Sequence, residues 1–192
     1  MSILFDPTIC FYQVAENCKY EWLAKINVFL ISELESTEPE IEQLCSLQRY
    51  PKGFALAVYQ RRYIYLAGGS ECSKVSCFDT KKNTWSDAPS MNIERYQSAA
   101  IALENYLYVA GGSSRDWSGD RYSSIERLDL SRAEAEWLIV LQHNTLVQRN
   151  LPAIVVVSTY QIAVFGGENG RVLNDGYIFD TNKLSVRRIM GK

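Results

Sequence analysis

The feature that most constrains this chain is a strand-like apolar run that ends on two adjacent glycines and occurs three times. The three runs are YIYLAGG (63–69), YLYVAGG (106–112) and QIAVFGG (161–167). A single run of this kind would mean little, because strands often end at glycine. A pattern that recurs along a chain predicts a repeat architecture, in which each copy is one supersecondary unit.

The sequence agrees on both sides of each glycine pair. Upstream, every unit has an arginine, an apolar strand and a short polar turn, and these segments begin at Arg49, Arg95 and Arg149. Downstream, every unit has a short strand and a polar turn, followed by Trp85, Trp137 or, in the third unit, Val186. The glycine pairs are 43 and 55 residues apart, which together with the apolar strands and polar turns predicts four antiparallel strands in each unit.

The glycines and the tryptophans both have a structural explanation. A glycine pair tolerates positive φ and a close approach of another backbone, so the chain can turn sharply where units crowd together. A large aromatic side chain late in the unit fills the wedge-shaped space between neighbouring units. We therefore expect both features to build the scaffold.

The order of these elements (Arg, apolar strand, Gly-Gly, aromatic-Asp, Trp) resembles the kelch repeat over residues 49–186, and the match is close over 74–112. The chain departs from the usual family pattern at Phe78, Leu128 and Phe179, where tyrosine is usual, and at Val186. The resemblance implies an all-β fold, a kelch-type β-propeller of about three and a half four-stranded antiparallel blades that form an incomplete ring. It also implies protein–protein recognition as the commonest role.

The pattern divides the chain into three parts. Residues 1–22 predict the outer half of a blade, with a strand, a polar turn and Trp22 in the closing strand. Residues 23–48 predict a strand that continues outward and then a solvated acidic loop with a helical turn at 39–45; the alternative is an insertion that docks a basic partner. Residues 49–192 predict three kelch-type blades, and all parts belong to one propeller domain.

Propellers close with about four to eight blades, which removes exposed strand edges. We therefore interpret the chain as part of a longer propeller, or as a product truncated at its start. The alternative is self-association of two copies through open propeller edges. That arrangement is less favourable, because every junction between copies would lack two inner strands.

Composition limits the classes of partner. The 192 residues are 47% apolar, which suffices for a core, and the net charge of −2 gives no basic field for nucleic acid. The longest apolar stretch, PAIVVV (152–157), is far shorter than a membrane span, and the N-terminal residues do not resemble a secretory signal. The five cysteines form no C-x-x-C pair, which favours a cytoplasmic protein with reduced thiols.

Residue types for catalysis and metal binding are scarce. Cys72 and Cys77 would need two further ligands to hold zinc. Some kelch-like propellers are copper oxidases that need two histidines, whereas His143 is the single histidine of this chain. The chain has no G-x-S-x-G motif and no phosphate-binding glycine loop. We predict no enzyme activity, no cofactor and no metal site.

In an antiparallel blade with strands A to D, the B–C loop and the D–A link emerge on the same face, where recognition is usual. The long loop 113–124 supplies the first candidate partner-binding residues, which are Arg115, Asp116, Trp117, Arg121 and Tyr122. Loop 168–173 supplies a second patch, which is Glu168, Asn169 and Arg171. The alternative for the first loop is that Trp117 folds back on its own blade and the arginines pair with Asp116 and Asp120.

We predict from these patterns an interaction module that displays loops on one face of a propeller to bind an unknown protein or peptide. Two alternatives stay open, namely a propeller-scaffold enzyme that acts on a sugar and a truncated propeller fragment with no independent function. The kelch family includes ubiquitin-ligase adaptors and actin-associated proteins. The residues of this chain select neither role.

Overall fold

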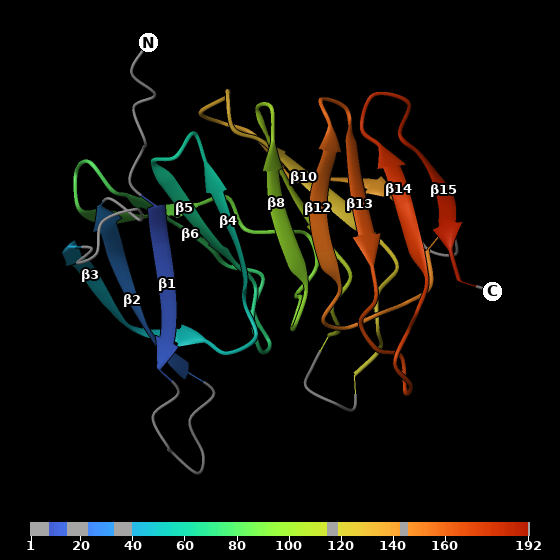
Figure 1. Cartoon of the computed structure of the whole chain (residues 1–192), viewed down its shortest axis with the longest axis horizontal. Coiled ribbons are helices and arrows are strands. Elements are labelled where there is room, and N and C mark those ends of the chain that lie inside the picture. The colour runs from blue at the N-terminus through green and yellow to red at the C-terminus, as the bar shows by residue number, and fades with distance from the viewer. Residues whose placement is uncertain (1–7, 15–22, 33–39, 115–118, 143–145, 192) are drawn as a thin grey trace.

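The computed structural model describes residues 8–14, 23–32, 40–114, 119–142 and 146–191. Within these ranges the chain forms antiparallel strands and no helix, and the strands make three four-stranded sheets and one three-stranded sheet. Figure 1 shows the sheets side by side, in chain order from the blue N-terminal sheet to the red C-terminal one. The structure confirms the predicted all-β fold, a partial β-propeller. Among the described residues, no helix is long and apolar enough to cross a membrane.

Each four-stranded sheet is one predicted repeat unit, and its strands follow one another in sequence order. Blade 1 comprises β4 (Ala55–Tyr59), β5 (Tyr63–Ala67), β6 (Val75–Asp79) and β7 (Thr84–Ala88). Blade 2 comprises β8 (Ala99–Leu103), β9 (Tyr106–Ala110), β10 (Ile125–Asp129) and β11 (Leu138–Leu141). Blade 3 comprises β12 (Ala153–Ser158), β13 (Gln161–Phe165), β14 (Gly176–Asp180) and β15 (Ser185–Met190).

The second and third strands of each blade form its core. β6 is buried along its whole length, and Ile64 and Leu66 of β5 are fully buried. A strand that is covered on both faces has apolar residues at consecutive positions. This explains the apolar segments that precede the glycine pairs. The fourth strand of blade 1, β7, is polar and mostly exposed.

The blades pack face to face through apolar seams. Small residues of blade 1, Ala55, Ala57 and Ala67, lie in one cluster with Leu107 and Trp137 of blade 2. The Trp137 ring is buried in this cluster, and its Nε1 donates a hydrogen bond to the carbonyl oxygen of Pro89, 2.7 Å away. The expectation that a late aromatic fills the space between blades is thus confirmed at this seam. In blade 3, Val186 is partly buried and packs against the apolar cluster that joins blades 2 and 3.

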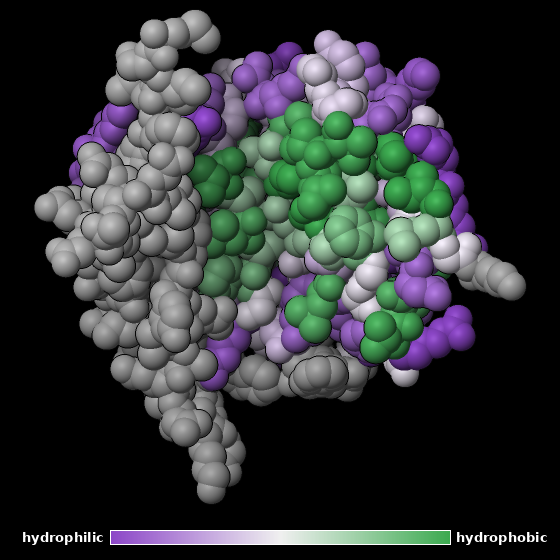
Figure 2. Space-filling model, in the orientation of Figure 1, coloured by the Kyte–Doolittle hydropathy of each residue, from purple (hydrophilic) through white to green (hydrophobic). Residues whose placement is uncertain are grey.

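The first strands of the three blades, β4, β8 and β12, lie next to one another along the inner side of the arc. Figure 2 shows apolar side chains gathered on the face where β8, β12 and β13 lie in Figure 1. On β12, the consecutive Val155, Val156 and Val157 are 43%, 46% and 49% exposed. The inner strand of the last blade therefore presents an apolar surface.

The N-terminal sheet has the order β1 (Thr8–Val14), β2 (Leu23–Ser32) and β3 (Glu40–Pro51). β1 and β2 pair antiparallel, in line with two strands joined by a turn, while Trp22 lies outside the described residues. The prediction of an acidic loop with a helical turn was wrong over 40–48, because β3 pairs with β2 there. Without β3, the outer edge of the ten-residue β2 would present unpaired backbone groups.

The glycine pair of blade 2 lies where two backbones approach closely. Gly111 and Gly112 have φ of +67° and +87°. A Cβ atom on Gly112 would lie 2.8 Å from the carbonyl oxygen of Tyr96 in the preceding link. Both the left-handed backbone and the available space therefore require glycine, as the sequence predicted.

An aspartate ends the third strand of every blade and caps the following turn. Asp79 accepts hydrogen bonds from the backbone N–H groups of Lys81 and Lys82, and Asp129 and Asp180 do the same for their own turns. The Arg62 guanidinium, which donates at 2.8 and 2.6 Å, and these turn N–H groups hold the pKa of the Asp79 carboxyl well below its ordinary value. The repeated aromatic-Asp element is therefore a turn cap.

We expect Gly112→Ala to lower the free energy of unfolding by about 2–4 kcal/mol, because the new Cβ adds a clash to the cost of a positive φ. Gly170→Ala is the matched control: its φ is +69°, but nothing lies within 4 Å of the new Cβ, so the loss should be about 1 kcal/mol. Denaturant unfolding followed by tryptophan fluorescence measures both. Equal losses would contradict the close approach.

A second prediction concerns acid. The pKa of Asp79 is lower in the folded chain than in the unfolded chain, so its ionised form stabilises the fold above pH of about 4. That contribution is lost as the pH falls through the folded pKa. Unfolding midpoints in denaturant should therefore be higher for the wild type than for Asp79→Asn at pH 7, and the gap should narrow between about pH 4 and pH 2. A gap independent of pH would contradict the assignment.

Candidate functional site

The candidate site is the loop face, which we define as the side of the arc formed by the described residues of the B–C loops (111–114, 119–124 and 166–175) and of the D–A links (89–98 and 146–152). The strands place these segments together because the B–C loop and the D–A link leave an antiparallel blade at the same end. Each link also carries the arginine that the sequence repeat predicted at its end. The contacts of these arginines explain how the face is held.

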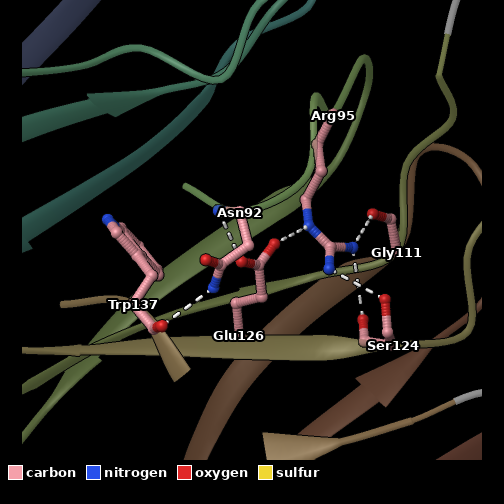
Figure 3. A network of polar contacts seen from close by, with 6 residues as sticks. All are labelled: Asn92, Arg95, Gly111, Ser124, Glu126 and Trp137. Carbon is pink, nitrogen blue, oxygen red and sulfur yellow. Dashed lines mark hydrogen bonds and ion pairs between the residues drawn. The ribbon is translucent and has the colours of Figure 1, made fainter. Parts of the chain in front are cut away.

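Arg95 inserts from the first link beneath the glycine pair of blade 2, and its side chain has no exposed surface (Figure 3). Its Nε lies 2.9 Å from Oε1 of Glu126, which is equally buried. Its Nη1 donates to the carbonyl oxygen of Gly111 at 2.7 Å, and its Nη2 donates to the hydroxyl of Ser124 at 2.8 Å. Burial lowers the pKa of the Arg95 guanidinium, and the charge of Glu126 opposes that effect.

Glu126 also holds the start of the same link. Its Oε2 accepts a hydrogen bond from the backbone N–H of Asn92 at 2.9 Å, and the Asn92 side chain donates to the carbonyl oxygen of Trp137 at 2.8 Å (Figure 3). One carboxylate therefore fixes both ends of the segment between Asn92 and Arg95. This segment is tied to blade 2 by side chains rather than by a strand ladder.

Arg149 repeats the arrangement at blade 3 with a different acidic partner. Its two terminal nitrogens lie 2.9 and 3.1 Å from the two carboxylate oxygens of Asp175, and Nη1 also donates to the carbonyl oxygen of Gly166 at 2.9 Å. Asp175 directly precedes β14, whereas Glu126 is the second residue of β10. Sequence reasoning recognised the arginines and missed both carboxylates, because the acidic residue changes its place in the repeat.

Backbone hydrogen bonds join successive links. The N–H of Gln97 donates to the carbonyl oxygen of Gly53 at 2.7 Å, and the N–H of Leu151 donates to that of Gln97 at 2.8 Å. The glycine pair joins this belt, since the N–H of Gly112 donates to the carbonyl oxygen of Arg149 at 2.8 Å. The rim of the loop face is therefore one connected network from blade 1 to blade 3.

Two of the predicted site residues form a bridge between the loops of adjacent blades. The Arg121 guanidinium contacts the Glu168 carboxylate through Nε and Nη2 at 3.1–3.2 Å. Glu168 also accepts from the side chain of Asn150 and from the backbone N–H of Gly170. Burial by itself would raise the pKa of Glu168, but these hydrogen bonds and the Arg121 charge outweigh it, so the pKa lies below its ordinary value.

The other predicted residues divide into three groups. Arg115, Asp116 and Trp117 lie outside the described residues, as does His143. Tyr122 is half-buried, with its ring 5.4 Å from the guanidinium carbon of Arg95. Asn169 and Arg171 are exposed. The structure pairs Arg121 with Glu168. The alternative, in which Trp117 folds back and the arginines pair with Asp116 and Asp120, involves residues outside the described ranges and stays a prediction.

A cavity of ≈ 660 Å³ opens on the loop face beside the second patch. Its wall includes Val147 of the link, Arg171 and Val172 of the loop, and Arg188 of β15. Val172 is 87% exposed, the most exposed of the large apolar side chains that the structure describes. Among the described residues, no group of three or more His, Cys, Asp and Glu side chains could hold a metal ion, and Cys72 and Cys77 are free thiols.

We expect Glu126→Leu to lower the free energy of unfolding by about 3–5 kcal/mol, because it leaves the Arg95 charge buried without its counter-ion. Asp87→Ala, which breaks the exposed pair with Lys74, is the control and should cost less than about 1 kcal/mol. Urea unfolding of both variants measures the difference. A loss for Glu126→Leu as small as that of the control would show that the buried pair is not needed.

Comparison with known proteins agrees with this geometry. The family model described as the KLHDC2/KLHL20/DRC7 Kelch-repeats domain matches residues 17–190. An F-box/kelch-repeat protein of Arabidopsis thaliana is 39% identical over 59 residues, which is 30% of this chain and 15% of that protein. Kelch repeat and BTB domain-containing protein 1 of cowpox virus (strain Brighton Red) is 34% identical over 91 residues, which is 44% of this chain and 16% of that protein.

Alpha-scruin of Limulus polyphemus is 29% identical over 115 residues, or 53% of this chain and 12% of that protein. The chain therefore spans less than a quarter of the length of each of these three relatives. The family model covers all three blades of this chain. The chain belongs to the kelch-repeat family.

Proposed function

We propose that the chain works as a protein-binding module whose loop face contacts a protein or peptide. The observation that carries this proposal is the second patch, where Arg171 and the 87% exposed Val172 stand beside a cavity on a loop held by Glu168. Membership of the kelch-repeat family supports protein partners in general. Exposed apolar and arginine side chains together are typical of contact surfaces.

The loop that carries this patch is held in one shape by its own hydrogen bonds. The N–H of Asn169 donates to the carbonyl oxygen of Arg171, and the N–H of Leu173 donates to that of Gly167, each at 2.9 Å. The Gly170 N–H donates to the Glu168 carboxylate at 3.1 Å. A loop that is already ordered loses less conformational entropy on binding, which favours affinity.

We propose separate tasks for the predicted site residues. Arg121, Tyr122 and Glu168 hold the loops in place, while Asn169 and Arg171 contact the partner. Arg115, Asp116 and Trp117, which the sequence places in the same loop, are the proposed contacts from blade 2, because arginine and tryptophan are frequent at the centres of interfaces. We place this interaction in the cytoplasm on the basis of cysteine usage.

The proposal predicts that Arg171→Glu combined with Val172→Ser lowers partner recovery at least about tenfold, because charge reversal and loss of the apolar contact act on the interface. Partners are first identified by cross-linking and affinity purification with the tagged wild-type chain, and then measured with purified components. Lys81→Glu combined with Lys82→Ser is the matched control, in an exposed turn at the opposite end of blade 1.

Binding that falls with the loop-face variant and persists with the turn variant would support the proposal. Equal binding by the two variants would overturn it. Recovery of only further copies of the chain would replace it with self-association through open propeller edges. Unchanged melting temperatures of both variants are required, so that a folding defect is not read as lost binding.

A further inference from the structure

Arg127 is a cation at the seam between blades 2 and 3 for which the described part of the chain provides no ion-pair partner. It lies on β10, and its guanidinium carbon is 4.5 Å from the centre of the Tyr106 ring. Its Nε is buried and has no hydrogen-bond acceptor. A buried donor without an acceptor is costly, so the position needs an explanation.

The scaffold itself does not require a charge at this position. In the strand register, Arg127 lies opposite Tyr108, in the place taken by Cys77 opposite Tyr65 in blade 1 and by Ile178 opposite Ala163 in blade 3. Both counterparts are neutral and buried. Because a thiol and an aliphatic side chain occupy this position in the other two blades, the fold of a blade does not require an arginine here.

Two cavities meet at Arg127, on the edge of the arc opposite the loop face. The smaller, of ≈ 200 Å³, is lined by Tyr108, Thr181, Asn182 and Leu184 and by the exposed Glu104 and Tyr160. The larger, of ≈ 400 Å³, is lined by Asp129, Arg132, Glu134 and Glu136. Tyr106 and Arg127 belong to both, so the guanidinium stands between them.

The charges around the two cavities differ. Glu134 and Glu136 stand in the wall of the larger cavity. Asp129 there is engaged by the Ser131 hydroxyl and by Arg132, and it also interacts with the Arg127 charge without a direct ion pair. In the smaller cavity, Arg127 faces one acidic side chain, the exposed Glu104, together with hydroxyl and amide groups that can donate hydrogen bonds. An anion is therefore better accommodated in the smaller cavity.

We propose that Arg127 anchors a carboxylate-binding site in the smaller cavity, at the seam between blades 2 and 3. The Tyr106 ring covers one side of the guanidinium and limits its contact with water, which strengthens a charge-assisted hydrogen bond. Tyr108, which already contacts Arg127 and Thr181, supplies a hydroxyl beside the anion. A volume of ≈ 200 Å³ suits a single acidic side chain of a partner, or a small free carboxylic acid.

This site does not depend on the loop face, because it lies at the opposite end of the strands. The test uses the full chain in a carboxylate-free buffer, with N-acetyl-glutamate N-methylamide as the probe and the glutamine analogue as its neutral match. Titrations are followed by NMR of backbone amides and of the Arg127 Nε–H group. The acidic probe should bind at least about tenfold more tightly than the neutral one.

Three variants make the test specific. Arg127→Ile, which introduces the residue type of blade 3, should weaken the acidic probe at least about tenfold, and Arg127→Lys should weaken it less because the charge is kept. Arg132→Gln is the control, since this arginine is 78% exposed and pairs with Asp129; it should change binding less than about twofold. Melting curves confirm that each variant is folded.

Free glutarate distinguishes the two sources of the carboxylate. Glutarate that binds as tightly as the capped glutamate assigns the site to a small free acid, and weaker binding assigns it to an acidic side chain of a partner; either result supports the site. Equal binding of the acidic and neutral probes would overturn it. The site would also be overturned if Arg127→Ile bound the acidic probe as tightly as the wild type while its melting curve showed that it was folded.

Discussion

The rest of the structure depends on two arginines that enter from the links and are buried beneath the glycine pairs. Arg95 and Arg149 each contact a carboxylate and a glycine carbonyl oxygen of the blade that follows. Removing two opposite charges from water is costly, and the cost is offset only when the hydrogen bonds are nearly complete. Here they are, since the Arg95 side chain makes four hydrogen bonds to three residues. At Gly111, Gly112 and Gly167 the link backbone passes so close that a side chain has no room.

This constraint explains why the loop face is the part of the molecule suited to recognition. The same links that carry the arginines form a belt of backbone hydrogen bonds from Gly53 through Gln97 to Leu151. The loops above that belt are joined by the Arg121–Glu168 pair. Strands and links therefore hold the exposed loop that carries Arg171. The residues that build the scaffold and those proposed to contact a partner are two separate sets. The opposite edge is built from short turns capped by aspartates. The larger Arg127 cavity is lined by the turn after Asp129, and the smaller one by the turn after Asp180.

Much of the fold could be predicted from sequence because each unit needs the same residue types at the same positions for local structural reasons. The glycine pairs need positive φ, and Trp137 fills the seam where alanines of blade 1 leave room. The carboxylate partners were missed because Glu126 and Asp175 occupy different positions in the repeat, and both reach the arginine only in three dimensions. The composition of segment 40–48 predicts a solvated loop, because its glutamates favour contact with water. In the structure this segment is a strand, because its backbone pairs with the long strand β2 despite its acidic residues. The aligned aromatic-Asp elements already place Arg127 at the position of Cys77 and Ile178, but its contact with the Tyr106 ring and the two cavities beside it are known only from the structure.

The central claim is that the arginine-bound links are as firmly held as the core strands. Hydrogen exchange of the wild-type chain under native conditions tests it most directly. The amide protons of Asn92 and Gly112 donate to Glu126 and to the Arg149 carbonyl oxygen. They should therefore exchange as slowly as those of β9, through global unfolding. Exchange of these two amides as fast as that of the exposed turn at 132–136 would show that the links open independently, and would contradict the account.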